Sequence, residues 1–116
     1  MAVERRRDVR VRPTQELPLT VTLESDAGDG TVVGVLDISH GGFGLHATGP
    51  LLEVKAGDRL HLRLEAMGKS ATVLAEVRHN GAKAGTTGVM FVDIEDPAKR
   101  LIRRYIAEMF ERGLSA

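Results

Sequence analysis

The sequence contains no cysteine and no tryptophan, and aromatic residues make up only 3% of its 116 positions. Without cysteine, the chain cannot form a disulfide scaffold, an iron–sulfur cluster, a cysteine zinc site or a thiol nucleophile. It also lacks the run of ~18–20 apolar residues that a membrane span needs. No apolar stretch of the kind found in secretory signals follows Met1. We therefore expect one soluble, cytoplasmic domain of ordinary size.

Net charge is also absent, because 16 lysines and arginines balance 16 aspartates and glutamates. The balance is uneven along the chain. Residues 1–12 hold five arginines and two acidic residues, a sum of +3, and the remaining 11 basic and 14 acidic residues sum to −3. Arginine presents a planar fork of donors that grips phosphate or a base edge with two hydrogen bonds. The basic segment is either a solvated tail or an anion-binding arm, and the neutral total argues against a general nucleic-acid coat.

Short segments in which apolar and polar residues alternate follow the basic segment, and this period of two is typical of half-buried β-strands. Turn sequences rich in Gly, Asn, Asp and Pro separate these segments. The expected strands cover residues 17–24, 31–38, 43–47, 58–66, 70–79 and 88–94. Short strands at this spacing predict a mainly β domain, a small antiparallel barrel or sandwich.

The last segment has the periodicity of a helix. Apolar residues recur at one-turn intervals from Leu101 to Phe110, opposite a charged face. Asp96 and Pro97 predict an N-cap and a first-turn proline, and Gly113 predicts the end of the helix. We expect this amphipathic helix, residues 96–113, to cap the β domain. Its apolar face could instead pair with a second subunit or lie on a membrane surface.

The most unusual stretch begins at Asp37 and reads D-I-S-H-G-G. In a regular strand Asp37 and Ser39 point to one face, while Leu36 and Ile38 point to the other and enter the core. Asp37 and Ser39 would then stand out together as hydrogen-bonding groups, and the following glycines would let a ligand approach the backbone. The alternative is a strand that ends in a glycine turn, with both side chains bonded to the turn itself.

Enzymatic interpretations of this stretch fail. Asp37, Ser39 and His40 are the residue types of a hydrolytic triad, but spacings of two and one on a strand cannot build the chain from nucleophile to base to orienting carboxylate. Residues 42–47 loosely match a dinucleotide fingerprint, yet no helix opens there. The four histidines lack the spacing of metal ligands. We therefore predict no enzyme activity, no metal site and no cofactor.

Two motifs are more specific together than either is alone. Residues 6–10 read R-x-x-x-R, and residues 37–42 read D-x-S-x-x-G. This pair, in this order, resembles the PilZ domain family of bacterial cyclic di-GMP receptors. Residues 85–94 look like the closing G-x-x-G-x-x-F strand of that family, so the similarity covers nearly the whole chain.

The resemblance implies a flexible arginine-rich arm (residues 1–14), a six-stranded antiparallel β-barrel (15–95) and a C-terminal helix (96–113). The arm is expected to fold across a ligand on the outer surface of the barrel, seated by Val9 and Val11. In the family, arginines of the first motif contact phosphates and guanine, the Asp and Ser of the second meet a guanine edge, and its last glycine leaves room for the ligand. The expected cyclic di-GMP residues are Arg5, Arg6, Arg7, Arg10, Asp37, Ser39, Gly41 and Gly42.

Arg5 bears on the number of ligands, because family members with arginine at this position tend to bind an intercalated cyclic di-GMP dimer. The resemblance further predicts a monomeric or homodimeric receptor whose ligand orders the arm and changes a surface for a partner protein. The outcome would be control of motility, biofilm or exopolysaccharide. An adaptor that binds no nucleotide is one alternative. A ligand-gated nucleic-acid binder is another, although few aromatic residues are present for base stacking.

Overall fold

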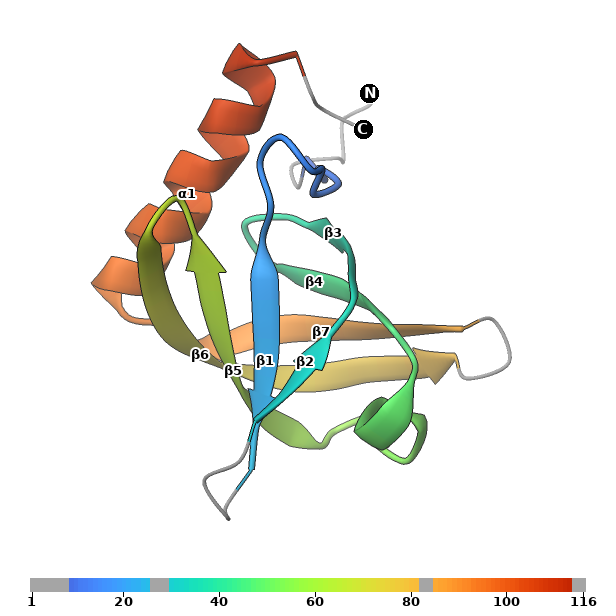
Figure 1. Ribbon diagram of the computed structural model, residues 1–116. Helices are drawn as coiled ribbons and strands as arrows, with labels where there is room; N and C mark the ends of the chain where they lie inside the picture. Colours follow the sequence, from blue (N-terminus) through green and yellow to red (C-terminus); the bar gives the residue numbers. More distant parts are fainter. Residues whose placement is uncertain (1–8, 26–29, 82–84, 114–116) are drawn as a thin grey trace, which may run out of the picture.

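A computed structural model describes residues 9–25, 30–81 and 85–113 of the chain. Within these ranges the protein forms seven β-strands, a short 3₁₀-helix and one α-helix, which lies beside the β5–β6 turn (Figure 1). The strands are β1 (Thr20–Glu24), β2 (Gly30–Val33), β3 (Val35–Ile38), β4 (Gly42–His46), β5 (Arg59–Ala66), β6 (Lys69–Gly81) and β7 (Thr86–Asp93). The 3₁₀-helix η1 (Gly49–Leu52) follows β4, and helix α1 (Asp96–Glu111) follows β7.

The strands form one antiparallel sheet in the order β2-β1-β5-β6-β7-β4-β3. Its two edge strands, β2 and β3, are consecutive in the chain and are separated only by Gly34. One bent segment therefore runs from one edge of the sheet to the other, which gives the molecule its barrel shape (Figure 1). The mainly β fold with a terminal helix is confirmed, but the strand count is seven rather than six, and the hydrogen-bonded order does not close.

Gly34 explains the extra strand. The His46 amide donates a hydrogen bond to the Gly34 carbonyl (2.9 Å), and the His46 ring occupies the space of a side chain at position 34. A Cβ built there would lie 2.6 Å from His46 Cδ2. The expected strand at 31–38 therefore breaks at the glycine. Its first half pairs with β1 and its second half pairs with β4.

The core lies inside the curved sheet. β5 alternates exposed and buried residues along its whole length, as the sequence predicts, and the expected inward face of β6 is also buried. The buried residues of these two strands are Leu60, Leu62, Leu64, Ala66, Val73, Ala75 and Val77.

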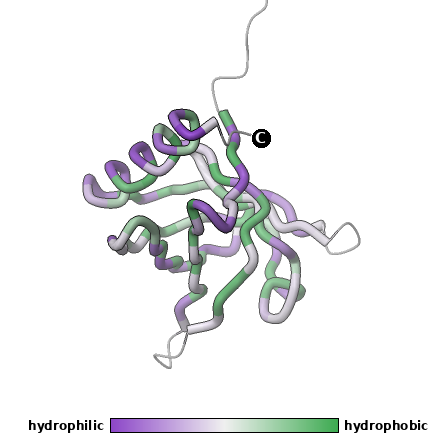
Figure 2. Tube along the Cα trace, turned by 45° about the horizontal axis from the view of Figure 1, so that its top comes forward, coloured by the Kyte–Doolittle hydropathy of each residue, from purple (hydrophilic) through white to green (hydrophobic). Residues whose placement is uncertain are grey.

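Helix α1 packs on its own barrel. Six of its side chains are buried and all six belong to the hydrophobic core, so the expected capping arrangement is present and the apolar face is covered within the same chain. Hydrophilic and hydrophobic residues alternate along the helix (Figure 2). Two details differ from expectation. The N-cap is Glu95 rather than Asp96, and Phe110, at the edge of the apolar stripe, is 47% exposed. The buried helix residues are Ala98, Leu101, Ile102, Tyr105, Ile106 and Met109.

Two strand boundaries also differ from the sequence prediction. β1 begins at Thr20 rather than at residue 17, because Pro18 has no amide hydrogen to donate to a neighbouring strand. The Asn80–Gly81 pair, expected as a turn, is the paired end of β6. Asn80 is held there by its side chain, whose Nδ2 donates to the Val54 carbonyl (2.7 Å) and whose Oδ1 accepts from Thr87 Oγ1 (3.0 Å).

Candidate ligand-binding site

The described part of the arm pairs with the end of β3. The amide of Val11 donates to the Ile38 carbonyl (3.0 Å), and the amide of Ile38 donates to the Val11 carbonyl (2.9 Å). The two residues form a single antiparallel bridge. Val11 is fully buried and seats the arm as expected, whereas Val9 is 43% exposed and does not. Residues 1–8, and with them Arg5, Arg6 and Arg7, lie outside the described residues.

The two sequence motifs meet beside this bridge. Arg10 Nη1 donates to Asp37 Oδ1 at 2.8 Å, although the residues are 27 positions apart. Since Val11 and Ile38 point inward, their neighbours Arg10 and Asp37 point outward. The Arg10 side chain is 52% exposed and that of Asp37 is 26% exposed. The structure therefore brings together, on an accessible surface, the arginine and the carboxylate that the sequence singled out.

Gly44 supports this arrangement and was missed by the sequence analysis. It pairs with Asp37 across β3 and β4, and a Cβ on Gly44 would lie 2.7 Å from Asp37 Oδ1. The glycine therefore leaves the space in which the Asp37 carboxylate rests. The available signal in the sequence was a glycine inside a strand, which often marks a close approach of another group.

Ser39 does not stand beside Asp37, contrary to the regular-strand prediction. A β-bulge between Val35 and Asp37 makes Leu36 an extra, half-buried residue, so Leu36 does not enter the core as expected. β3 ends at Ile38, so Ser39 belongs to the turn that follows and the alternation of faces does not extend to it. Ser39 is fully buried, its Oγ accepts from the Gly41 amide (3.2 Å) and its own amide donates to the Gly42 carbonyl (3.0 Å). For Ser39 the structure therefore shows the alternative interpretation, in which the strand ends in a glycine turn and the serine side chain bonds to that turn.

The two glycines of the motif fasten the turn to β7. The Gly41 carbonyl accepts a hydrogen bond from the Phe91 amide (2.8 Å). A Cβ on Gly42 would lie 2.0 Å from the Val89 carbonyl oxygen, so only glycine allows the backbones of β4 and β7 to approach this closely. This packing requirement exists without any ligand. The role of Gly42 in leaving room for a ligand stays a prediction.

Each fixed position of the closing G-x-x-G-x-x-F segment has a structural role. Gly85 has φ +77°, a left-handed conformation that favours glycine. Gly88 lies under the ring of His79, whose Nε2 would be 2.4 Å from an added Cβ. Phe91 meets Phe43 edge to face, with ring centroids 5.0 Å apart. The Phe91–Phe43 contact holds β7 against β4, the strand that supports Asp37, and the Gly88–His79 contact lies between β7 and β6.

The described residues were also compared with the requirements of a metal site and of a membrane-spanning helix. No group of three or more His, Asp or Glu side chains is placed to hold a metal ion in the described part of the chain. No helix within those same ranges is long and apolar enough to cross a membrane.

Comparison with solved structures identifies the fold. The structure of the K. pneumonia MrkH–c-di-GMP complex matches with a TM-score of 0.73 and 20% identity, over 97% of this chain and 55% of that one. The PilZ domain of YcgR from Escherichia coli, solved with c-di-GMP, matches with a TM-score of 0.66 and 20% identity, over 95% of both chains. Bacillus subtilis MotI/DgrA, an inhibitor of motility, matches with a TM-score of 0.66 and 20% identity, over 94% of this chain and 53% of that one.

This chain thus spans about half the length of MrkH and MotI/DgrA, but nearly all of the isolated YcgR domain. No curated protein sequence matches it. The sequence profile of the PilZ domain matches residues 4–108, which include the arm, the barrel and most of the helix. The chain belongs to the PilZ domain family.

Proposed function

We propose that this PilZ domain is a receptor for cyclic di-GMP, not an enzyme, and that it binds the nucleotide between the N-terminal arm and the barrel surface at Asp37. The observation that carries the proposal is the 2.8 Å contact between Arg10 and Asp37, which joins the two sequence motifs at one accessible place. Two of the similar structures, MrkH and the YcgR domain, contain c-di-GMP, which supports the same ligand class here.

The chemistry of the two side chains suits guanine. The O6 and N7 atoms of guanine accept hydrogen bonds from an arginine fork, and its N1–H and N2–H₂ groups donate to a carboxylate. Without ligand, Arg10 and Asp37 pair with each other. The nucleotide would replace this exposed ion pair, whose loss costs only about 0.2–1 kcal/mol. The two phosphates of the ligand would meet the +3 charge of residues 1–12.

The decisive experiment is a calorimetric titration with cyclic di-GMP. We expect Arg10→Ala and Asp37→Ala each to weaken binding about tenfold to a hundredfold, since a lost bidentate contact is worth about 1–3 kcal/mol. Arg59→Ala is the matched control, because Arg59 and Glu76 form another ion pair with side chains 61% and 26% exposed. Its affinity should equal that of the wild type. Absence of binding heat from the wild type at tens of micromolar ligand would overturn the receptor role and favour an adaptor that binds no nucleotide.

The same titration gives the stoichiometry. We expect two cyclic di-GMP molecules per chain, bound as an intercalated dimer, because an additional arginine, Arg5, precedes the first motif. Arg5→Leu should reduce the ratio to one molecule. A ratio of one for the wild type would contradict the dimer while leaving the receptor role intact.

Ligand binding should also order the arm and so change a surface that a cytoplasmic partner protein reads. The amides of Val11 and Ile38, which form the bridge, should exchange hydrogen more slowly when cyclic di-GMP is bound. The Val77 amide, bonded to the Asp58 carbonyl inside the barrel framework (2.8 Å), should be unaffected. The similarity to MotI/DgrA, an inhibitor of motility, favours control of motility as the output. Control of biofilm or exopolysaccharide is the other proposed output.

A further inference from the structure

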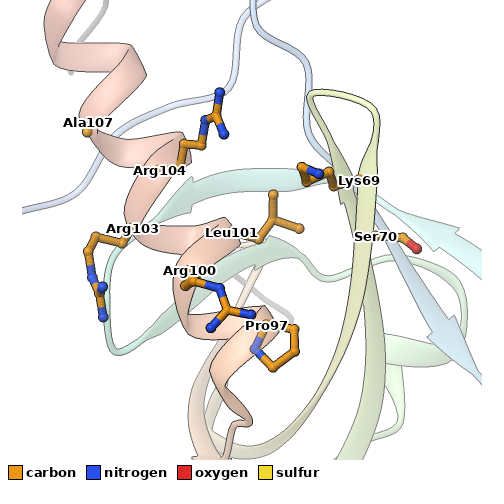
Figure 3. Close-up of a pocket in the computed structure, with 8 residues that line it drawn as sticks. All are labelled: Lys69, Ser70, Pro97, Arg100, Leu101, Arg103, Arg104 and Ala107. Carbon is orange, nitrogen blue, oxygen red and sulfur yellow. The ribbon is translucent and has the colours of Figure 1, made fainter.

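A basic groove lies between helix α1 and the start of β6, away from the Arg10–Asp37 contact. Its cavity has a volume of about 590 Å³. Arg100 and Arg104 reach into the groove from the helix, Lys69 faces them from β6, and Leu101 lies between the two walls (Figure 3). We call this surface the basic groove.

The cations of the basic groove form no ion pair with any residue that the structure describes. Among the arginines that the structure describes, four of the six outside α1 (Arg10, Arg59, Arg63 and Arg112) form salt bridges, and none of the three within α1 does. Lys69 likewise has no ion pair within the described ranges. The positive charge of this surface is therefore available to an external anion, whereas most other described arginines are already paired.

The floor of the groove is apolar. The Leu101 side chain is only 5% exposed and closes the groove from below, and the Pro97 ring lines one end beside Arg100 (Figure 3). Arginine is enriched at protein–protein interfaces, and its guanidinium group forms strong charge-assisted hydrogen bonds with carboxylates. This combination fits an occupant that carries both carboxylates and an apolar side chain.

The positively charged segment of the helix is also short. Asp96 lies one turn before Arg100 and Glu108 lies one turn after Arg104, so the basic stretch of residues 99–104 covers only about 8 Å of helix axis. A continuous polyanion such as DNA carries a charge every ~1.7 Å and would run over the Asp96 carboxylate at one end and the Glu108–Arg112 ion pair at the other. A short acidic segment would meet the arginines alone.

We propose that the basic groove binds a short acidic segment of a partner protein, with carboxylates on Arg100, Arg104 and Lys69 and an apolar side chain on Leu101. The inference rests on the proposed receptor function and names the surface that its partner reads. Helix α1 and its C-cap contact the segment that connects the arm to β1, because Tyr105 Oη donates to the Leu17 carbonyl (2.6 Å) and Arg112 Nη1 donates to the Glu16 carbonyl (3.2 Å). The arm and the groove are thus joined through one helix.

The test is a selection of random short peptides on the immobilised full chain, with and without cyclic di-GMP, followed by fluorescence anisotropy. Selected peptides should be enriched in Asp and Glu around an apolar residue, and their amide versions (Asn, Gln) should bind at least about tenfold more weakly. The double variant Arg100→Glu/Arg104→Glu should lose binding by a similar factor. Arg78→Glu changes an exposed arginine outside the groove that forms no ion pair within the described ranges; it is the control and should bind as the wild type does.

Three results would overturn the proposal: no selected peptide, selected peptides without acidic enrichment, or equal binding by the double variant. Tighter binding of duplex DNA or of phosphatidylserine vesicles through the same arginines would also overturn it, because the occupant would then be a different polyanion. The double variant must show the wild-type urea unfolding curve, and Arg100→Gln/Arg104→Gln provides a milder second test.

Cyclic di-GMP titrations of the same proteins separate this inference from the receptor function. The double variant should bind the nucleotide as the wild type does, because its substitutions lie outside the arm. A wild type that binds cyclic di-GMP but no acidic peptide would overturn the groove alone. A wild type that binds acidic peptide but no nucleotide would overturn the receptor function alone.

Discussion

The two ends of the described chain are attached to the barrel in different ways. Near the N-terminus, one backbone bridge, one buried valine and the exposed Arg10–Asp37 ion pair hold residues 9–12. Near the C-terminus, helix α1 buries six side chains in the common core. One of them is Tyr105, whose hydroxyl donates a hydrogen bond to the Leu17 carbonyl. An exposed ion pair contributes about 0–1 kcal/mol, whereas each large apolar side chain buried contributes about 1.5–3 kcal/mol. A ligand can therefore exchange the Arg10–Asp37 pair at little cost, while Val11 and the helix are held in place by buried apolar side chains.

The largest expected effect comes from the helix. Ile102 is 2% exposed, and Ile102→Ala should lower the free energy of unfolding by about 2–5 kcal/mol because it leaves a cavity in the core. Phe110→Ala is the control on the same helix, at a side chain that is 47% exposed, and should change stability by less than about 0.5 kcal/mol. Urea unfolding measures both. Equal losses would mean that α1 buries a different face.

Alkaline pH should weaken the helix attachment and leave the arm attachment unchanged. Burial raises the pKa of the Tyr105 phenol from 10.0 to about 12. The folded state therefore keeps a proton that the unfolded state releases above pH 10, and stability falls by about 1.4 kcal/mol per pH unit between pH 10 and 12. Below pH 10 this contribution is fully present. The total loss is about 2–3 kcal/mol.

Tyr105 is the only tyrosine and the chain has no tryptophan, so near-ultraviolet absorbance reports its ionisation directly. In Tyr105→Phe the Leu17 carbonyl loses its donor, and the stability of this variant should no longer depend on this ionisation. Titration of the wild-type phenol near pH 10 would contradict a buried, protonated tyrosine and with it the strength of the helix attachment.

Gly42 and Gly44 lie on either side of Phe43 in β4. Substitutions at these two positions should distinguish effects on barrel stability from effects on the geometry of the Arg10–Asp37 contact. Gly42→Ala would press a methyl group against the Val89 backbone (2.0 Å) and should cost about 1–3 kcal/mol or more. Gly44→Ala would meet the Asp37 carboxylate (2.7 Å), which is the end of a mobile side chain. We expect little loss of stability from it but weaker cyclic di-GMP binding. Urea unfolding and calorimetry measure the two effects, and a large stability loss in Gly44→Ala would show that Asp37 is fixed.

The sequence predicted those parts of the fold that depend on local periodicity. The alternation in β5 and the apolar stripe of α1 follow from the spacing of side chains alone, so both were found. The break at Gly34 depends on the His46 ring that occupies its side-chain space, and the pattern of valines around Gly34 does not contain that contact. The family motifs singled out Asp37 and Arg10, which the structure brings into contact at 2.8 Å, and their roles in ligand binding stay predictions. The regular-strand prediction misplaced Leu36 because the bulge there depends on the partner strand. It misplaced Ser39 because β3 ends at Ile38 and the turn that follows buries the serine.

The smallest expected effect on stability concerns the arm itself. A double-mutant cycle of Arg10→Ala and Asp37→Ala, measured by urea unfolding without ligand, should give a coupling energy of about 0.2–1 kcal/mol, because both side chains are accessible to water. The same two variants should each weaken cyclic di-GMP binding about tenfold to a hundredfold. A coupling above about 2 kcal/mol would mean that the Arg10–Asp37 pair is a strong contact, unlike an ordinary exposed ion pair. The ligand would then have to break a strong contact rather than exchange a weak one, and the arm could not act as the movable half of the site.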